Sequence, residues 1–80
     1  MIKIGIKIQI KKEVLDSEGR ALLELLNSEE KKIIDCHYGK YIELQINETD
    51  EKKALEIAQK ATEKGLYNPL IESFSLEVIK

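Results

Sequence analysis

The residues best suited to nucleophilic chemistry are Cys36 and His37, the only cysteine and the only histidine in the chain. A cysteine nucleophile needs a base within hydrogen-bond reach. Apolar and polar residues alternate around this pair, which predicts a strand, and neighbouring side chains of a strand point to opposite faces. The two side chains therefore cannot meet. We interpret Cys36 as a small apolar core residue and His37 as an exposed strand residue.

Other reactive patterns are missing from the sequence. The four glycines are isolated from one another, so there is no glycine-rich phosphate loop. One cysteine and one histidine cannot supply the four ligands of a structural zinc ion. The only arginine, Arg20, falls in a predicted helix, and paired cysteines that could carry copper are absent. The sequence therefore predicts no catalytic, cofactor-binding or metal site on this chain.

Length and charge narrow the class of protein further. Eighty residues make a single domain over residues 1–80. The 15 acidic and 13 basic residues are interspersed, with a net charge of −2, so the chain lacks the concentrated basic footprint that nucleic acid requires. No segment approaches the roughly 18 consecutive apolar residues of a membrane span. A single cysteine favours a reducing compartment, and we expect a cytoplasmic protein with no nucleic-acid or membrane partner.

Hydrophobic periodicity predicts six elements. Isoleucine occupies every second position from Ile2 to Ile10, which is typical of a strand with one buried face. Asp16 is the expected N-cap of a helix that ends near Asn27, and Asp50 is the expected N-cap of a second helix that ends near Gly65. Further strands are expected over residues 33–38, 41–46 and 73–79, with a tight hairpin turn at Gly39-Lys40.

The resulting order, β-α-β-β-α-β, predicts an α+β fold. Its mainly antiparallel four-stranded sheet would carry two helices on one face, in a ferredoxin-like or closely related arrangement. The other face, or an edge of the sheet, is then expected to meet another chain. A core of this size without a disulfide or a metal has a thin margin of stability, which also favours oligomerisation.

Three stretches, taken in this order and at this spacing, resemble a known family. They are residues 11–21 (KKEVLDSEGRA), 39–44 (GKYIEL) and 68–74 (NPLIESF). In these stretches the chain resembles the PurS family, the small subunit of phosphoribosylformylglycinamidine synthase, also called formylglycinamide ribonucleotide amidotransferase. The family-motif positions, which we expect to be structural or partner-facing, are Asp16, Gly39, Lys40, Asn68 and Pro69. The chain departs from the family pattern at His37, where arginine is common, and at Thr62, where cysteine is common.

The resemblance implies a role in de novo purine biosynthesis. The family's enzyme is an ATP-dependent ligase that converts formylglycinamide ribonucleotide and glutamine to the amidine. Its small subunit is non-catalytic, forms a homodimer or a dimer of dimers, and bridges a PurQ-like glutaminase subunit and a PurL-like synthetase subunit while assisting ammonia transfer. ATP and Mg belong to the synthetase subunit, so the resemblance implies no cofactor on this chain.

A second function stays open from the residues alone. A free-standing dimeric regulatory domain of the same plan could bind a small ligand, such as an amino acid, between its subunits. The loop Asn68-Pro69-Leu70-Ile71 could line that pocket, although no glycine-rich turn near the first helix offers backbone N–H groups to a ligand. Thermal shift with glutamine, ATP and common amino acids would separate the two hypotheses.

Overall fold

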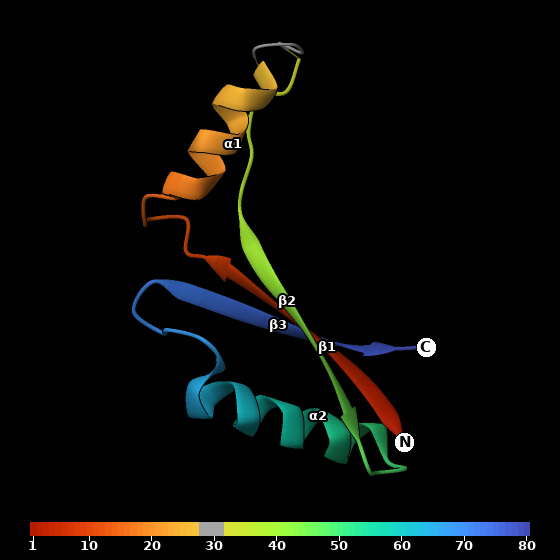
Figure 1. Cartoon of the computed structure of the whole chain (residues 1–80). Coiled ribbons are helices and arrows are strands. Elements are labelled where there is room, and N and C mark those ends of the chain that lie inside the picture. The colour runs from red at the N-terminus through yellow and green to blue at the C-terminus, as the bar shows by residue number, and fades with distance from the viewer. Residues whose placement is uncertain (28–31) are drawn as a thin grey trace.

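The computed structural model describes residues 1–27 and 32–80, which form a three-stranded sheet and two helices (Figure 1). The elements, in chain order, are β1 (Ile2–Ile10), α1 (Ser17–Asn27), β2 (Gly39–Ile46), α2 (Glu51–Ala61), a π-helical turn η1 (Thr62–Leu66) that continues α2, and β3 (Glu72–Ile79). None of the helices in these residues is long and apolar enough to cross a membrane. The two helices and the antiparallel sheet confirm the predicted α+β class.

The strand with the isoleucine repeat lies in the middle of the sheet. The strand order is β2-β1-β3, and both pairings are antiparallel. Ile6 of β1 lies between Ile42 of β2 and Leu76 of β3. Cross-strand neighbours share a face, so all three strands direct apolar side chains to the same side. This side carries the hydrophobic core.

Helix α2 covers the apolar face of the sheet. Asp50 is its N-cap, as predicted, and the side chain accepts a hydrogen bond from the backbone N–H of Lys52. Ala54 and Ala58 are fully buried against the isoleucines of β1, because their small side chains let the helix approach the sheet closely. The fully buried apolar side chains are Ile4, Ile6, Ala54 and Ala58, with Ile8 almost completely buried.

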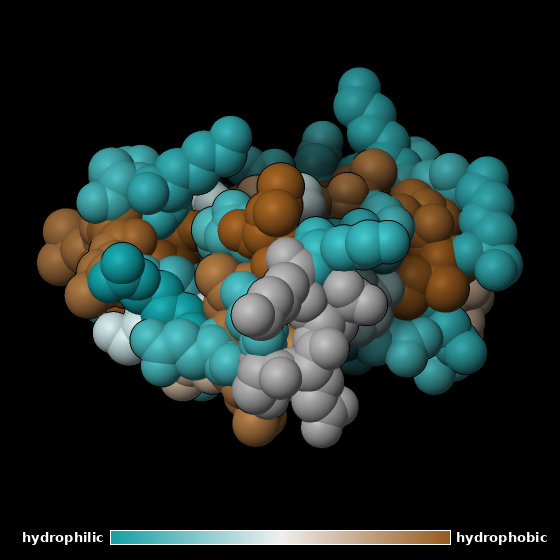
Figure 2. Space-filling view, turned by 90° about the horizontal axis from the view of Figure 1, so that it is seen from above, coloured by the Kyte–Doolittle hydropathy of each residue, from teal (hydrophilic) through white to brown (hydrophobic). Residues whose placement is uncertain are grey.

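Helix α1 does not share that face, so the prediction of two helices on one face is wrong. It stands beyond the end of the sheet, next to the chain that leads into β2 (Figure 1). Leu22, Leu25 and Leu26 are between 37% and 67% exposed, because no sheet lies beneath them. Apolar groups accordingly reach the surface when the molecule is viewed from this end (Figure 2). The radius of gyration is 15.7 Å, against about 12 Å for a compact chain of this length.

The sheet has three strands in the described residues, where the sequence predicted four. Residues 33–38 form no strand, and Gly39 and Lys40 begin β2 instead of turning a hairpin. The alternation explains why. Across a two-residue hairpin turn Tyr38 would face Tyr41 and share its side of the sheet, which would place residues 34 and 36 opposite the apolar face. In the structure the chain runs into β2 without a hairpin turn, and the even-numbered Ile42, Leu44 and Ile46 of β2 pack against the core.

Candidate functional site at one end of the sheet

The antiparallel order brings one end of every strand together. Gln9 near the end of β1 pairs with Gly39 at the start of β2, and Ile10 pairs with Glu72 at the start of β3. Helix α1 follows β1 after a short connection, so its first turn lies at the same end. The five family-motif positions come from three distant segments, and the structure brings all of them to this end of the sheet.

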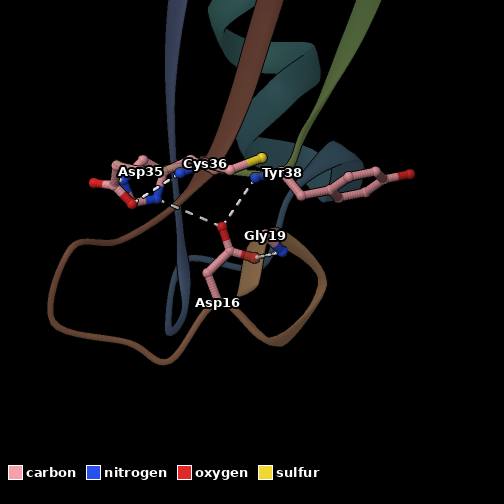
Figure 3. A network of polar contacts seen from close by, with 6 residues as sticks. Asp16, Gly19, Asp35, Cys36 and Tyr38 are labelled. Carbon is pink, nitrogen blue, oxygen red and sulfur yellow. Dashed lines mark hydrogen bonds and ion pairs between the residues drawn. The ribbon is translucent and has the colours of Figure 1, made fainter. Parts of the chain in front are cut away.

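Asp16 ties the start of α1 to the chain that precedes β2 (Figure 3). Its Oδ1 accepts a hydrogen bond from the backbone N–H of Gly19 at 2.9 Å, so the predicted N-cap is confirmed. Its Oδ2 accepts a second bond from the N–H of Tyr38, also at 2.9 Å. These two donors, that of Tyr38 first, hold the pKa of the Asp16 carboxyl below its usual range. One carboxylate thus fixes two segments that are far apart in the sequence.

Only glycine fits at position 19, because there is no room for a Cβ at this junction. A Cβ on Gly19 would lie 2.5 Å from the backbone carbonyl oxygen of Cys36 and 2.5 Å from Oδ2 of Asp16. The helix can therefore approach residue 36 only with glycine in its first turn. Sequence reasoning missed this role and counted Gly19 only as an isolated glycine. The signal was a glycine inside a helix, where it is intrinsically unfavourable.

Lys40 and Asn68 are joined through Glu72, which sequence reasoning also missed. Oε2 of Glu72 lies 3.4 Å from Nζ of Lys40, and Oε1 accepts a hydrogen bond from the N–H of Asn68 at 2.7 Å. The side chain of Glu72 is only 13% exposed. Oδ1 of Asn68 accepts from the N–H of Leu70, and the exposed Pro69 lies within that turn. This network connects the start of β2 to the loop before β3.

Gly39 allows β2 to begin close to β1. A Cβ at this position would lie 2.6 Å from the carbonyl oxygen of Ile8, which is a backbone atom that cannot move aside. The glycine that sequence reasoning assigned to a hairpin turn is therefore needed for a close approach between strands.

Cys36 and His37 do not form a reactive pair in the structure. Nε2 of His37 lies 3.0 Å from Oδ2 of Asp35, and Nδ1 lies 3.6 Å from Oδ2 of Asp16, so both ring nitrogens face carboxylates. His37 is exposed, as predicted, but it lies outside any strand, so the predicted strand position is wrong. Cys36 is half-buried and lies outside the core cluster, so the prediction of a core position is wrong. Within residues 1–27 and 32–80, no group of three or more His, Cys, Asp or Glu side chains could hold a metal ion.

Tyr41 crosses the open face of the sheet, opposite α2. Its hydroxyl donates a hydrogen bond to Oε1 of Glu77 on β3 at 3.0 Å. The ring passes over Gly5 of β1, where a Cβ would lie 2.0 Å from the tyrosine oxygen. Desolvation raises the pKa of the Tyr41 hydroxyl, and the bond to Glu77 raises it further. Tyr41 thus spans all three strands.

The fold and this site together define a class of protein: a small α+β domain whose polar side chains hold its own backbone segments together at one end of a sheet. The family model that matches residues 3–80 is PurS, phosphoribosylformylglycinamidine (FGAM) synthase. The chain belongs to the PurS family and is a subunit of this ligase of purine biosynthesis.

Individual relatives agree with the family assignment. The PurS subunit of phosphoribosylformylglycinamidine synthase from Bacillus subtilis is 33% identical over 79 residues, which cover 98% of this chain and 93% of that protein. The crystal structure of Methanocaldococcus jannaschii PurS, one of the subunits of formylglycinamide ribonucleotide amidotransferase, superposes with a TM-score of 0.90 at 31% identity, covering 100% and 98% of the two chains. A chain of the PurLQS structure from Thermotoga maritima gives 0.86 at 30% identity, covering 98% and 96%.

Proposed function

We propose that this chain docks a PurQ-like glutaminase subunit against a PurL-like synthetase subunit and contributes no catalytic residue. The proposal rests on one observation: the polar side chains at the end of the sheet bind groups of this chain itself. Asp16 and Glu72 accept backbone N–H groups, and Lys40 pairs with Glu72. Side chains engaged in this way fix the shape of a surface. The family-motif positions therefore act as structural or partner-facing residues.

A docking subunit suits the chemistry of this ligase. Ammonia released into water is protonated and diffuses away, so the site that releases it and the site that consumes it must be held in fixed register. A small protein with rigid polar faces and sheet edges can provide that register without reacting itself. ATP and Mg are then used by the synthetase subunit, and the assembly works in the cytoplasm.

The docking unit is a homodimer, which can pair further into a dimer of dimers. Leu22, Leu25, Leu26 and the 90% exposed Ile34 leave apolar surface uncovered on one chain. Residues 33–38 run as extended chain into β2, which is an edge strand of the sheet (Figure 1). An exposed edge is a template for pairing with a second chain. The predicted fourth strand would form there, through pairing with the second copy.

A three-component assay tests this function. The chain is mixed with the synthetase and glutaminase subunits of the same organism, and amidine formation is measured with glutamine and then with an ammonium salt. We expect the glutamine-dependent activity to require this chain, while the ammonia-dependent activity of the synthetase persists without it. Equal glutamine-dependent rates with and without the chain would contradict the proposal. Loss of both activities on omission would instead indicate a catalytic role.

A further inference from the structure

A groove of about 780 Å³ opens between the β1–α1 connection, α1 and residues 35–37. We call it the β1–α1 groove. Its apolar lining includes the half-buried side chains of Ile10, Val14 and Leu23. Leu15, at the same groove, is 64% exposed. The groove therefore offers apolar surface to a partner, although its walls carry many polar groups.

The charges that are free at this groove are mainly positive. Lys11, Lys12 and Arg20 line it, and none of the three side chains has an ion-pair partner among residues 1–27 and 32–80. Two lining carboxylates, those of Asp16 and Asp35, are already engaged by backbone N–H groups and by His37. Glu13 remains as an acidic side chain on the same lining. The groove thus combines an apolar lining with a surplus of unpaired cations.

This combination fits an acidic protein segment better than a small anion. A small anion would be held at the N-terminus of α1, but the carboxylate of Asp16 already occupies that place. The available cations are on long side chains around an apolar lining. A segment with apolar side chains flanked by Asp or Glu would bury its apolar side chains in the groove. Its carboxylates would pair with the cations around the lining.

We infer that the β1–α1 groove is the docking site for an acidic, apolar segment of a partner subunit. The inference rests on the proposed function, because it names the surface by which the docking subunit holds one of its two partners. Charge complementarity selects the occupant, because the unpaired cations of the lining can pair with the Asp and Glu side chains of such a segment.

Charge reversal tests the site. The variant Lys11→Glu/Lys12→Glu/Arg20→Glu is compared with Lys52→Glu/Lys60→Glu/Lys64→Glu, which changes the net charge equally on exposed positions of α2 and η1. Binding to the purified synthetase and to the purified glutaminase subunit is measured separately over a series of salt concentrations. We expect the groove variant to bind one subunit at least about tenfold more weakly at low salt, with the difference shrinking as salt rises. The control variant should stay within about twofold of the unmodified protein.

A further variant separates the apolar contribution from the charges. Leu15→Gln should weaken binding to the same subunit without changing its salt dependence, because it removes apolar contact and no charge. Equal binding by the groove variant and the unmodified protein would overturn the inference, as would equal losses in the groove and control variants. Light scattering that finds the groove variant monomeric beside a dimeric control would assign the groove to a second copy and also overturn it. Failure of the unmodified chain to bind either subunit would instead overturn the proposed function itself.

Discussion

At the scale of single residues, the acidic side chains of Asp16 and Glu72 at the end of the sheet bind backbone N–H groups. Asp16 accepts two N–H groups from separate segments, and Glu72 accepts one while it pairs with Lys40. The N-cap role of Asp16 follows from its place before a helical pattern, so sequence could predict it. The bond to Tyr38 could not be predicted, because it depends on where a segment 22 residues later lies in space. The same holds for Glu72, whose partners become visible only when the strands are paired.

Asp16 should make stability depend on pH. The hydrogen bonds from Tyr38 and Gly19 lower its pKa in the folded protein. A carboxyl with a lowered folded pKa contributes its full stability above the unfolded pKa of about 4, and this contribution is lost as the pH falls through the folded value. We expect the free energy of unfolding to fall more steeply below about pH 4 in the unmodified protein than in Asp16→Asn, as measured by urea denaturation. Parallel pH profiles for the two proteins would contradict this role.

Gly19→Ala should destabilise the protein although alanine favours helices. Alanine gains about 1 kcal/mol of intrinsic helix propensity over glycine. Its Cβ, however, would lie 2.5 Å from the carbonyl oxygen of Cys36, so the helix must shift. We expect a net loss of roughly 1–3 kcal/mol, which is typical of overpacking, in urea denaturation. Glu24→Ala, at an exposed position of the same helix, should stay within about 0.5 kcal/mol of the unmodified protein. A stabilised Gly19→Ala variant would show that the close contact can relax.

At the scale of elements, signals carried by neighbouring residues predicted the structure better than signals for pairing between distant segments. The isoleucine repeat of β1 and the caps of both helices are signals that neighbouring residues carry, and all three are confirmed. The hairpin at Gly39-Lys40 failed because a glycine suits both a turn and a close approach between strands, and composition does not separate the two. The prediction of where α1 lies was wrong for a related reason. The apolar stripe of α1 shows that the helix must be covered, but it does not show which part of a protein covers it.

The contact between Gly5 and Tyr41 links all three strands and can be tested by a double-mutant cycle. Gly5→Ala would place a Cβ 2.0 Å from the present position of the tyrosine oxygen, so the ring must move and the hydrogen bond to Glu77 is lost. We expect Gly5→Ala to destabilise the protein alone but to be neutral or stabilising in a Tyr41→Ala background, because alanine suits a strand better than glycine. Urea denaturation of the four proteins measures the coupling. Additive effects would mean that the ring has another way to accommodate the methyl group.

At the scale of the whole molecule, the structure is long and thin for its chain length. Its extents are 47 × 28 × 13 Å, and the part formed by α1 and residues 32–38 lies outside the layer of α2 and the sheet. Sequence predicted that a core of this size needs further support, and the exposed leucines of α1 show where that support is missing.

A homodimer should therefore form through the α1 end. We expect light scattering at micromolar concentration to give twice the chain mass of 9.2 kDa, or a multiple of that dimer. Leu22→Asp/Leu26→Asp should shift the protein towards monomer, because it places charge on apolar surface that a second chain covers. Lys60→Asp, on the exposed face of α2, is the control and should leave the mass unchanged. A well-folded monomer for the unmodified protein would count against both the dimer and the use of α1 as its contact.

The central place of β1 also has a consequence for how the chain folds as it is synthesised. β1 is the first strand to be synthesised, and one of its two neighbours, β3, is the last. Ile4 can therefore pair with Val78 only after nearly the whole chain has been made. Pairing between such distant positions is slow, since a long loop must close before the contacts can stabilise it. Until then, the edge of β1 that will meet β3 remains available to other nascent chains. A ribosome that stalls before Glu72 would thus present an unfinished sheet rather than a smaller stable one.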